Sequence, residues 1–387
     1  MMNEFPKKLS RRSFLTSTGS AALLATGIGG PASSLFGNPK VAQEKDLELI
    51  LRRARPLNLE TPRAGLNSWL TPTHLFYVRN HYQNPDVVLA DWQVSIGGEV
   101  DPPKALNFAA IRRLPKVTII ATTECTGNGR AYFQPKTKGN QWEVGAVGNA
   151  VWSGVRLSDL LKDFGIHSAG KFVTLKGGEK RPSDATPQFI RSIPIDKAMQ
   201  EVILAYEMNG MPLTPDHGYP IRALVPGWYG ASSVKWLVGI NITREPDSGH
   251  YQQESYRIQH EGQDLKDAGY ATVLNVKSII STPGVSTVSA GRIPVQGVAW
   301  SGAGEIRRVE FSADSGKNWQ DADLIGLQVP HAWQSWFYLW TARPGSYKLM
   351  SRATDSAGRV QPLRIAWNRK GYSNNAVADH AIEVTVV

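Results

Sequence analysis

The sequence predicts an α+β protein in which a mixed domain of strands and short helices is followed by an antiparallel β-sandwich. A chain of 387 residues is long for a single domain, so two folded units are expected. Helical patterns alternate with strand-like segments up to about residue 265, whereas from about residue 271 only strand-like segments separated by turns remain. We therefore predict a first domain at residues 45–265 and a β-sandwich at residues 270–387.

The first domain contains apolar patterns of both the strand period and the helix period. Strands are predicted at residues 76–78, 92–100, 117–121, 171–176 and 202–206. Helical character is predicted at residues 46–55, 106–114, 155–164 and 195–199. Residues 142–152 include Gly145, Gly148 and Asn149, so we predict that they form a loop that passes close to a bound group.

The second domain shows the alternation of apolar and polar residues that half-buried strands require. Strands are predicted at residues 273–280, 293–300, 306–312, 336–341, 346–353 and 381–387. Turn sequences separate them, such as Ala313–Gly316 and Asp355–Gly358. This pattern is typical of an immunoglobulin-like sandwich, although the cysteine pair of antibody domains is missing.

Composition excludes several classes of function. The formal charge is +10, but the basic residues are scattered and form no nucleic-acid motif, so anionic small molecules or acidic proteins are the expected partners. A single cysteine excludes intrachain disulfides, iron–sulfur clusters, Cys-based zinc sites and a Cys-Xaa-Xaa-Cys-His haem attachment. Neither the Walker A nor the Rossmann glycine pattern is present, which disfavours those modes of nucleotide binding.

The N-terminus carries an export signal. Ser10–Leu15 reads Ser-Arg-Arg-Ser-Phe-Leu, a twin-arginine pattern, and a mild apolar run follows at Ala21–Ile28. We predict that residues 1–40 are a twin-arginine signal peptide and that the mature protein is periplasmic. No other stretch reaches the roughly 18 apolar residues of a membrane span, so none is expected in the mature protein.

The only cysteine, Cys125, follows the predicted strand at residues 117–121 and precedes a Gly/Asn loop that ends at Arg130. A strand that ends in such a loop can bring backbone N–H groups close to a ligand. A thiolate there is a soft metal ligand or a nucleophile. A small buried apolar residue is the more frequent role of a lone cysteine, and spacing alone leaves these alternatives open.

A second dense stretch runs from Asp216 to Leu237. It combines a histidine, an arginine, a lysine and two serines with many turn-forming residues, which suits a phosphate-bearing heterocyclic cofactor in a cationic cleft. Earlier in the chain, Arg79 is a candidate oxyanion or phosphate binder and His81 a candidate ligand or hydrogen-bond donor. Asp184, in a Gly/Lys/Arg/Pro/Ser loop, is a weaker candidate for bonding a ligand.

Taken together, these stretches resemble the sulfite oxidase family of molybdopterin oxidoreductases, in the family's order and over essentially the whole mature chain. The matching segments are Phe76–His81, Glu124–Arg130, Gly148–Leu157, Leu204–Gly210, Asp216–Arg222, Ser233–Leu237 and Trp367–Gly371. The resemblance implies a mixed molybdopterin-binding domain followed by a dimerisation domain, and therefore a homodimer. It replaces the reading of Cys125 as a core residue with that of a molybdenum ligand.

The resemblance also implies roles for the surrounding residues. Arg79 and Tyr256 match the family's anion pocket and active-site tyrosine. A second pocket arginine falls at or next to Arg369 and Lys370, and the simplest register puts Lys370 there. Binding of the molybdopterin cofactor is implied for Tyr77, Val78, Asn80, His81, Arg130, Asp184, His217, Arg222, Ser233, Val234 and Lys235.

The implied reaction is oxidation of sulfite to sulfate. With no haem in this chain, the electrons are expected to pass to an external c-type cytochrome. The alternative within the family is a sulfane dehydrogenase that acts on carrier-bound sulfur in a thiosulfate-oxidising system. Sulfoxide reduction is disfavoured because those relatives share only the molybdenum domain. A metal-free periplasmic anion-binding protein is disfavoured because a buried thiol beside clustered cations is costly without a ligand.

Overall fold

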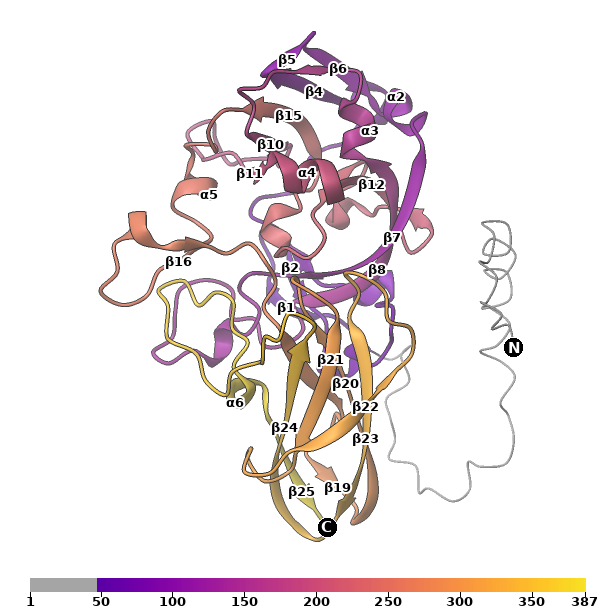
Figure 1. Ribbon diagram of the computed structural model, residues 1–387, viewed down its shortest axis with the longest axis vertical. Coiled ribbons are helices and arrows are strands. Elements are labelled where there is room, and N and C mark those ends of the chain that lie inside the picture. The colour runs from indigo at the N-terminus through magenta and orange to yellow at the C-terminus, as the bar shows by residue number, and fades with distance from the viewer. Residues whose placement is uncertain (1–46) are drawn as a thin grey trace, which may run out of the picture. The chain divides into compact units, whose positions relative to one another are not determined.

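The computed structural model describes residues 47–387, and the predicted signal peptide lies outside them. Two five-stranded sheets form the frame of the first domain (Figure 1). One sheet has the order β11 (Ile190–Pro194), β10 (Phe172–Gly177), β15 (Leu237–Thr243), β4 (Gln93–Gly98) and β6 (Lys104–Asn107). The other comprises β13 (Met211–Pro212), β12 (Ile203–Met208), β8 (Val147–Arg156), β7 (Lys116–Glu124) and β14 (Arg222–Leu224), which pairs with β12.

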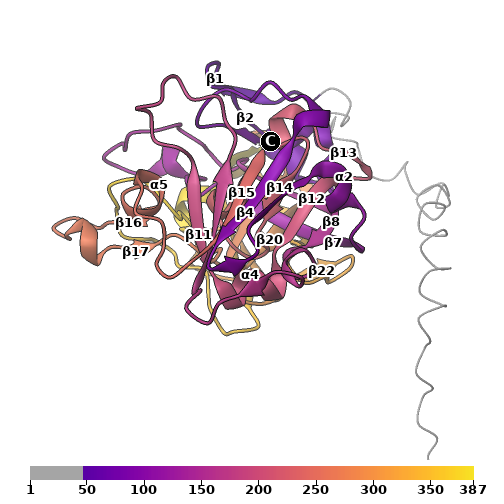
Figure 2. The ribbon, with the colours of Figure 1, turned by 90° about the horizontal axis from the view of Figure 1, so that it is seen from above.

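All pairings within these two sheets are antiparallel except that of β15 with β4, which lie side by side in Figure 2. The sheets share one apolar core with the short helices α3 (Leu157–Leu161) and α4 (Ile195–Glu201). The sequences of β10 and β4 favour strands because apolar residues recur at every second position, and these residues are buried: Val173 and Leu175 in β10, Val94 and Ile96 in β4. Smaller elements are α2 (Phe108–Arg112), α5 (His250–Gln253), β5 (Val100–Asp101), β9 (Gly165–Ile166), β16 (Arg257–Ile258) and β17 (Gly269–Tyr270).

The C-terminal strands form a continuous eight-stranded sheet that folds back on itself. Its order is β18 (Lys277–Thr282), β20 (Gly291–Trp300), β23 (Gln334–Ala342), β22 (Gln320–Ile325), β21 (Ile306–Ser312), β24 (Gly345–Asp355), β25 (Ile382–Val386) and β19 (Thr287–Val288). Because the sheet folds back, β18 faces β24, and the Ser278 hydroxyl on β18 donates a hydrogen bond of 2.9 Å to the Ser351 hydroxyl on β24. The enclosed core is apolar and includes Phe311, Trp336 and Trp340. Helix α6 (Val377–His380) precedes β25.

The predicted α+β class with a β-sandwich-like second domain is confirmed, but two local predictions are wrong. Residues 46–55 do not form a helix where they are described, because β1 (Ile50–Arg53) pairs with β2 (Asn58–Glu60), which in turn pairs with β3 (Val78–Arg79). Tertiary strand pairing here outweighs a weak helical pattern.

Residues 142–152 are only partly a loop, because β8 begins at Val147. Gly148 has a packing role in this strand. A Cβ atom at this position would lie 2.5 Å from the Phe76 ring, so only glycine lets that ring lie against the strand.

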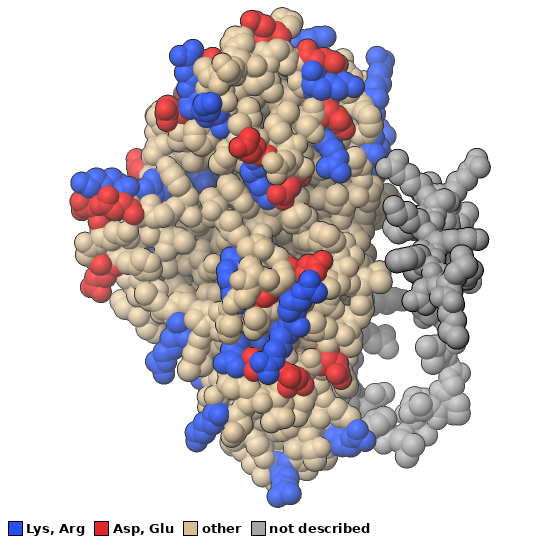
Figure 3. All heavy atoms as spheres, in the orientation of Figure 1, with Lys and Arg blue, Asp and Glu red and all other residues tan. Residues whose placement is uncertain are grey.

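In the described part of the chain, no helix is long and apolar enough to cross a membrane. On the face drawn in Figure 3, basic and acidic side chains are interspersed. Several arginines are instead buried inside the first domain, among them Arg130 and Arg222.

Candidate active site

A pocket in the first domain collects side chains from segments that are distant in sequence. Nine of the predicted site residues line it: Tyr77, Arg79, His81, Cys125, His217, Arg222, Ser233, Lys235 and Tyr256. They come from the β3 region, the end of β7, the segment from Asp216 to Lys235 that surrounds β14, and the turn before β16. The two dense sequence stretches therefore meet around Cys125.

Cys125 sits directly after β7, in a turn that the backbone holds on both sides. Its N–H donates to the Ala146 carbonyl at 2.8 Å, and its own carbonyl accepts from the Asn128 N–H at 2.9 Å. Burial raises the pKa of the Cys125 thiol, although the charges of Arg79 and Arg130 act in the opposite direction. Since burial favours the neutral thiol, a bound metal cation would be needed to hold this side chain as a thiolate.

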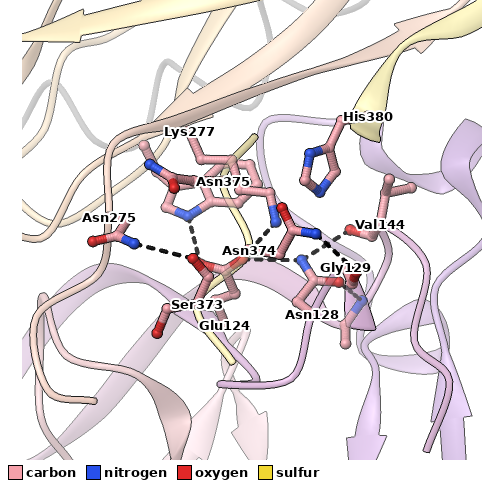
Figure 4. A network of polar contacts seen from close by, with 12 residues as sticks. Glu124, Asn128, Gly129, Val144, Asn275, Lys277, Ser373, Asn374, Asn375 and His380 are labelled. Atoms are coloured by element: carbon pink, nitrogen blue, oxygen red, sulfur yellow. Dashed lines mark hydrogen bonds and ion pairs between the residues drawn. The ribbon is translucent and has the colours of Figure 1, made fainter. Parts of the chain in front are cut away.

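The residue before the cysteine is anchored by the second domain (Figure 4). The Glu124 carboxylate accepts from the Lys277 ammonium and from the Trp300 indole N–H, both at 3.0 Å. It also accepts from the Asn128 side-chain amide at 3.1 Å. Glu124 and Lys277 are only 2% and 1% exposed. A buried ion pair thus ties the cysteine turn to β18 and β20.

His217, Arg222 and Lys235 form one group of basic pocket residues. The Arg222 guanidinium donates to the carbonyls of His217 and Ser233 at 3.1 and 3.2 Å, and its Nε finds no partner. The Lys235 ammonium donates to the Asp216 carbonyl at 2.8 Å and lies 4.2 Å from the centre of the Trp236 ring. These hydrogen bonds go to neutral groups, and in the described part of the chain neither Arg222 nor Lys235 forms an ion pair, although the charges of Glu179 and Asp216 act on Lys235.

Burial lowers the pKa values of these three basic residues. It lowers the pKa of Arg222 to about 10 and that of His217 to about 3, so the imidazole is neutral at physiological pH. Burial and the neighbouring Arg222 together lower the pKa of Lys235 well below its ordinary value. A bound phosphate would reverse the burial effect by supplying the missing negative charge.

Arg79, His81 and Tyr256 form a second group of pocket residues. The Tyr256 hydroxyl and His81 Nε2 share a hydrogen bond of 2.5 Å. Burial lowers the pKa of His81 well below its ordinary value, and Arg79 adds to this effect. Burial alone would lower the pKa of Arg79 as well, but Tyr256 and Cys125 raise it overall. Tyr256 has a left-handed backbone with a φ of 56°, a strained conformation that is common at functional sites.

The residues fit a molybdenum–molybdopterin cofactor. The pocket combines a buried thiol with the cations Arg222 and Lys235, which form no ion pair in the described part of the chain, and Arg222 Nε is an orphaned buried donor. Between residues 47 and 387, no three His, Cys, Asp or Glu side chains gather as a metal site, so a metal at Cys125 would take its other ligands from a cofactor. Cys125 would hold the metal, and Arg222, Lys235, His217 and Ser233 the phosphate-bearing part.

Glu179 adds a titratable carboxylate to this pocket. Burial raises the pKa of the Glu179 carboxyl from 4.5 to about 7, against smaller opposite effects of its own backbone N–H, Lys235 and Arg79. Because the folded-state pKa lies above the unfolded value, the stability that this group contributes is complete below pH 4.5. It is lost as the pH rises through 7.

In the cofactor-free protein, Glu179→Gln is therefore expected to raise the free energy of unfolding by about 3 kcal/mol at pH 8, with little change at pH 4. Denaturant unfolding of both proteins at the two pH values checks this. An equal effect at pH 4 and pH 8 would show that the carboxyl is not destabilised by its burial.

The other predicted site residues do not line the pocket. Val78 and Val234 are buried in the core. Asn80 is also outside the pocket lining, but its side-chain carbonyl accepts from the ammonium of Lys235, which lines the pocket. Asp184 is exposed and paired with Arg181 at 3.3 Å.

The predicted second arginine also falls outside the pocket lining. The Arg369 side chain is exposed, and Lys370 is half-buried. Lys370 contacts another predicted site residue, Arg130, through its backbone carbonyl, which accepts from Arg130 Nε at 2.8 Å. Arg130 is also held by the Asn140 carbonyl at 3.0 Å and lies 5.2 Å from the centre of the Tyr372 ring.

Sequence reasoning missed several pocket residues. Glu179 and Phe189 lie on either side of a loop, and Thr123 and Thr126 flank the cysteine turn. Phe189 stacks on His81, with ring centres 4.4 Å apart. The proximity of Thr123 and Thr126 to Cys125 in sequence was a usable signal, whereas nothing local distinguishes Glu179 or Phe189.

Comparisons with known proteins identify the family of both domains. Residues 81–251 match the family model of the oxidoreductase molybdopterin binding domain, and residues 269–386 match that of the Mo-co oxidoreductase dimerisation domain. Sulfite oxidase of Arabidopsis thaliana is 33% identical, over 90% of this chain and 96% of that protein. Mitochondrial sulfite oxidase of Drosophila melanogaster is 36% identical, over 89% of this chain. The crystal structure of the sulfane dehydrogenase SoxCD from Paracoccus pantotrophus superimposes with a TM-score of 0.78 at 28% identity, covering 94% of this chain and 99% of that chain.

Fold and pocket together define a molybdopterin oxidoreductase. Within that class, the chain belongs to the sulfite oxidase family, which confirms the resemblance seen in the sequence. It spans 65% of the length of the Drosophila protein.

Proposed function

We propose that the protein oxidises sulfite to sulfate at a molybdenum–molybdopterin cofactor whose metal is bound by Cys125. The reaction consumes water and releases two protons and two electrons for each sulfite. The bound cofactor supplies the metal centre that accepts the two electrons and transfers the oxygen atom. The observation that carries the proposal is that a buried thiol, Arg79 and Tyr256 line the same pocket as the cations suited to the cofactor.

The chain's own residues bind and orient the reactants. Arg79 is a half-buried, permanently charged group in the same pocket as Cys125, and such a group attracts a dianion more strongly than it would in water. In the tautomer that carries its proton on Nε2, the neutral His81 ring donates to the Tyr256 oxygen across the 2.5 Å contact, which leaves the phenol O–H to donate to a substrate oxygen. Burial keeps Tyr256 protonated, since it raises the pKa of the phenol above its ordinary value.

A second candidate is oxidation of sulfane sulfur attached to a carrier protein. The superposition on the sulfane dehydrogenase SoxCD over almost the whole chain favours it. We prefer free sulfite because the pocket places a fixed cation, Arg79, next to the thiol. A dianion benefits from that charge much more than a sulfur atom at the end of a carrier does.

We further propose that the enzyme is a periplasmic homodimer that passes electrons to an external c-type cytochrome. The twin-arginine pattern at Ser10–Leu15 supports the location, and the match to a dimerisation domain at residues 269–386 supports the dimer. The single cysteine supports an external acceptor, because covalent attachment of a c-type haem requires a Cys-Xaa-Xaa-Cys-His sequence.

The test is an anaerobic assay of the molybdenum-loaded protein with cytochrome c as acceptor. One sample receives free sulfite and the other a peptide that carries a cysteine persulfide. We expect sulfate to form from sulfite, with two cytochromes reduced per sulfate, and little reduction with the peptide. Turnover confined to the persulfide peptide would replace sulfite oxidation by sulfane dehydrogenation.

A further inference from the structure

Arg191 is a buried arginine that sequence reasoning passed over and that does not itself line the pocket. It lies on β11 and is 1% exposed. One guanidinium N–H donates to the Tyr251 carbonyl, while Nε has no hydrogen-bond partner. Among the described residues no carboxylate hydrogen-bonds this guanidinium, and the charge of the Asp247 carboxylate raises the pKa of Arg191 less than burial lowers it. Burying a cation in this way is costly unless the site gains from the charge.

The guanidinium is directed at the active-site tyrosine. Its central carbon lies 5.2 Å from the centre of the Tyr256 ring, within the range of a cation–π contact. The same ring stacks on Tyr372, with centres 5.5 Å apart and planes 16° apart. Tyr256 is thus fixed by an aromatic ring, a cation and the His81 hydrogen bond, and of these residues Tyr256 and His81 line the pocket whereas Arg191 and Tyr372 do not.

Arg191 and Arg79 shift the pKa values of the same two groups, Tyr256 and His81. Both arginines oppose the effect of burial on the pKa of Tyr256, and both add to the effect of burial on the pKa of His81. The position that the family resemblance assigns to a second pocket arginine is occupied by Arg369 or Lys370, and neither lines the pocket. A second positive charge close to the substrate therefore has to come from a residue other than Arg369 or Lys370.

We propose that Arg191 is a positioning residue of the anion pocket, which fixes the Tyr256 phenol and supplies, from behind its ring, positive charge that attracts a dianionic sulfur oxyanion. This inference rests on the proposed function of the same pocket. It assigns to β11 the electrostatic task that the family motif would have given to residues 369–370. The competing explanation is that Arg191 only braces the backbone at Tyr251.

The experiment compares Arg191→Gln and Arg191→Lys in the molybdenum-loaded protein. Arg112→Gln is the matched control, because this exposed arginine also lies over a tyrosine, 5.4 Å from the centre of the Tyr206 ring, away from the pocket. Sulfate binding is measured by isothermal titration calorimetry, and kcat and KM are measured with sulfite. Metal content and Tm are recorded for each variant.

We expect Arg191→Gln to raise the Kd for sulfate and the KM for sulfite about tenfold, with a smaller change in kcat. Arg191→Lys should recover most of this loss, because it keeps the charge, and Arg112→Gln should match the wild type. A sulfate Kd within twofold of wild type in Arg191→Gln would overturn the proposal. It would equally fail if Lys and Gln lowered Tm and kcat alike without a change in KM.

Calorimetry with sulfate also separates this inference from the proposed function. If the wild-type protein binds sulfate but does not oxidise sulfite, the activity assignment fails while the dependence of sulfate binding on Arg191 is still decided. Should Arg191→Gln fail to fold, the comparison of Arg191→Lys with wild type decides, since the proposal requires sulfate binding to persist in the lysine variant.

Discussion

Cys125→Ser is expected to lower sulfite oxidation at least about 10³-fold, well beyond the 10- to 100-fold losses typical of residues behind a metal ligand. A serine hydroxyl is a hard donor that keeps its proton at neutral pH, so it cannot replace a soft thiolate on a transition metal. The measurement is the rate of sulfate formation per bound molybdenum, with the metal content of each preparation determined independently.

The fold should survive this substitution. The turn is held by backbone contacts of Cys125 with Ala146 and Asn128, and the serine keeps all of them. Unfolding of the cofactor-free variant should therefore differ from wild type by no more than about 1–2 kcal/mol, the cost of burying a hydroxyl. Near-wild-type turnover in metal-loaded Cys125→Ser would rule out the thiolate as an essential ligand.

Lys277→Met is expected to lower the free energy of unfolding by about 3–5 kcal/mol. Its ammonium is the only cation paired with Glu124 in the described part of the chain, and both side chains are almost fully buried. Removing the lysine leaves a buried carboxylate that only neutral donors, Asn128 and Trp300, continue to contact. Denaturant unfolding of the purified variant, with wild type in parallel, measures the loss.

Lys116→Met is the matched control for this prediction. Lys116 pairs with Glu207 at 2.5 Å, but the lysine side chain is 50% exposed, so its loss should cost less than about 1 kcal/mol. The double variant Glu124→Gln with Lys277→Met should be more stable than the sum of the single changes predicts, because no unpaired charge remains. Equal, small effects of Lys277→Met and Lys116→Met would show that the buried pair does not hold the two domains together.

The strands of this protein were largely predictable, because their apolar faces are local features of the sequence. The segment at residues 306–312 is an example, since its apolar residues Ile306, Val309 and Phe311 indicate β21 although a bulge interrupts their alternation. By contrast, β22 was not predicted. Almost all of its residues are exposed, and those in its first half are polar or small, so the sequence shows no apolar face. β1 was predicted as a helix because it depends on pairing with β2, which no local pattern reveals.

The cofactor side of the pocket was predictable for a different reason. Cys125 and the residues from His217 to Lys235 lie in turn-rich stretches whose composition is unusual for a core. Arg191, Glu179 and Phe189 could not be found in this way, because each lies in or beside an ordinary strand. Their role depends on the approach of β10 and β11 to the segment around Tyr256, which is a property of the fold.

The central claim is that Cys125 binds the molybdenum at which sulfite is oxidised. The most direct test is X-ray absorption at the molybdenum edge, comparing the metal-loaded wild type with Cys125→Ser. Our account predicts one molybdenum–sulfur contact fewer in the variant. An identical number of sulfur contacts in the two proteins would contradict it.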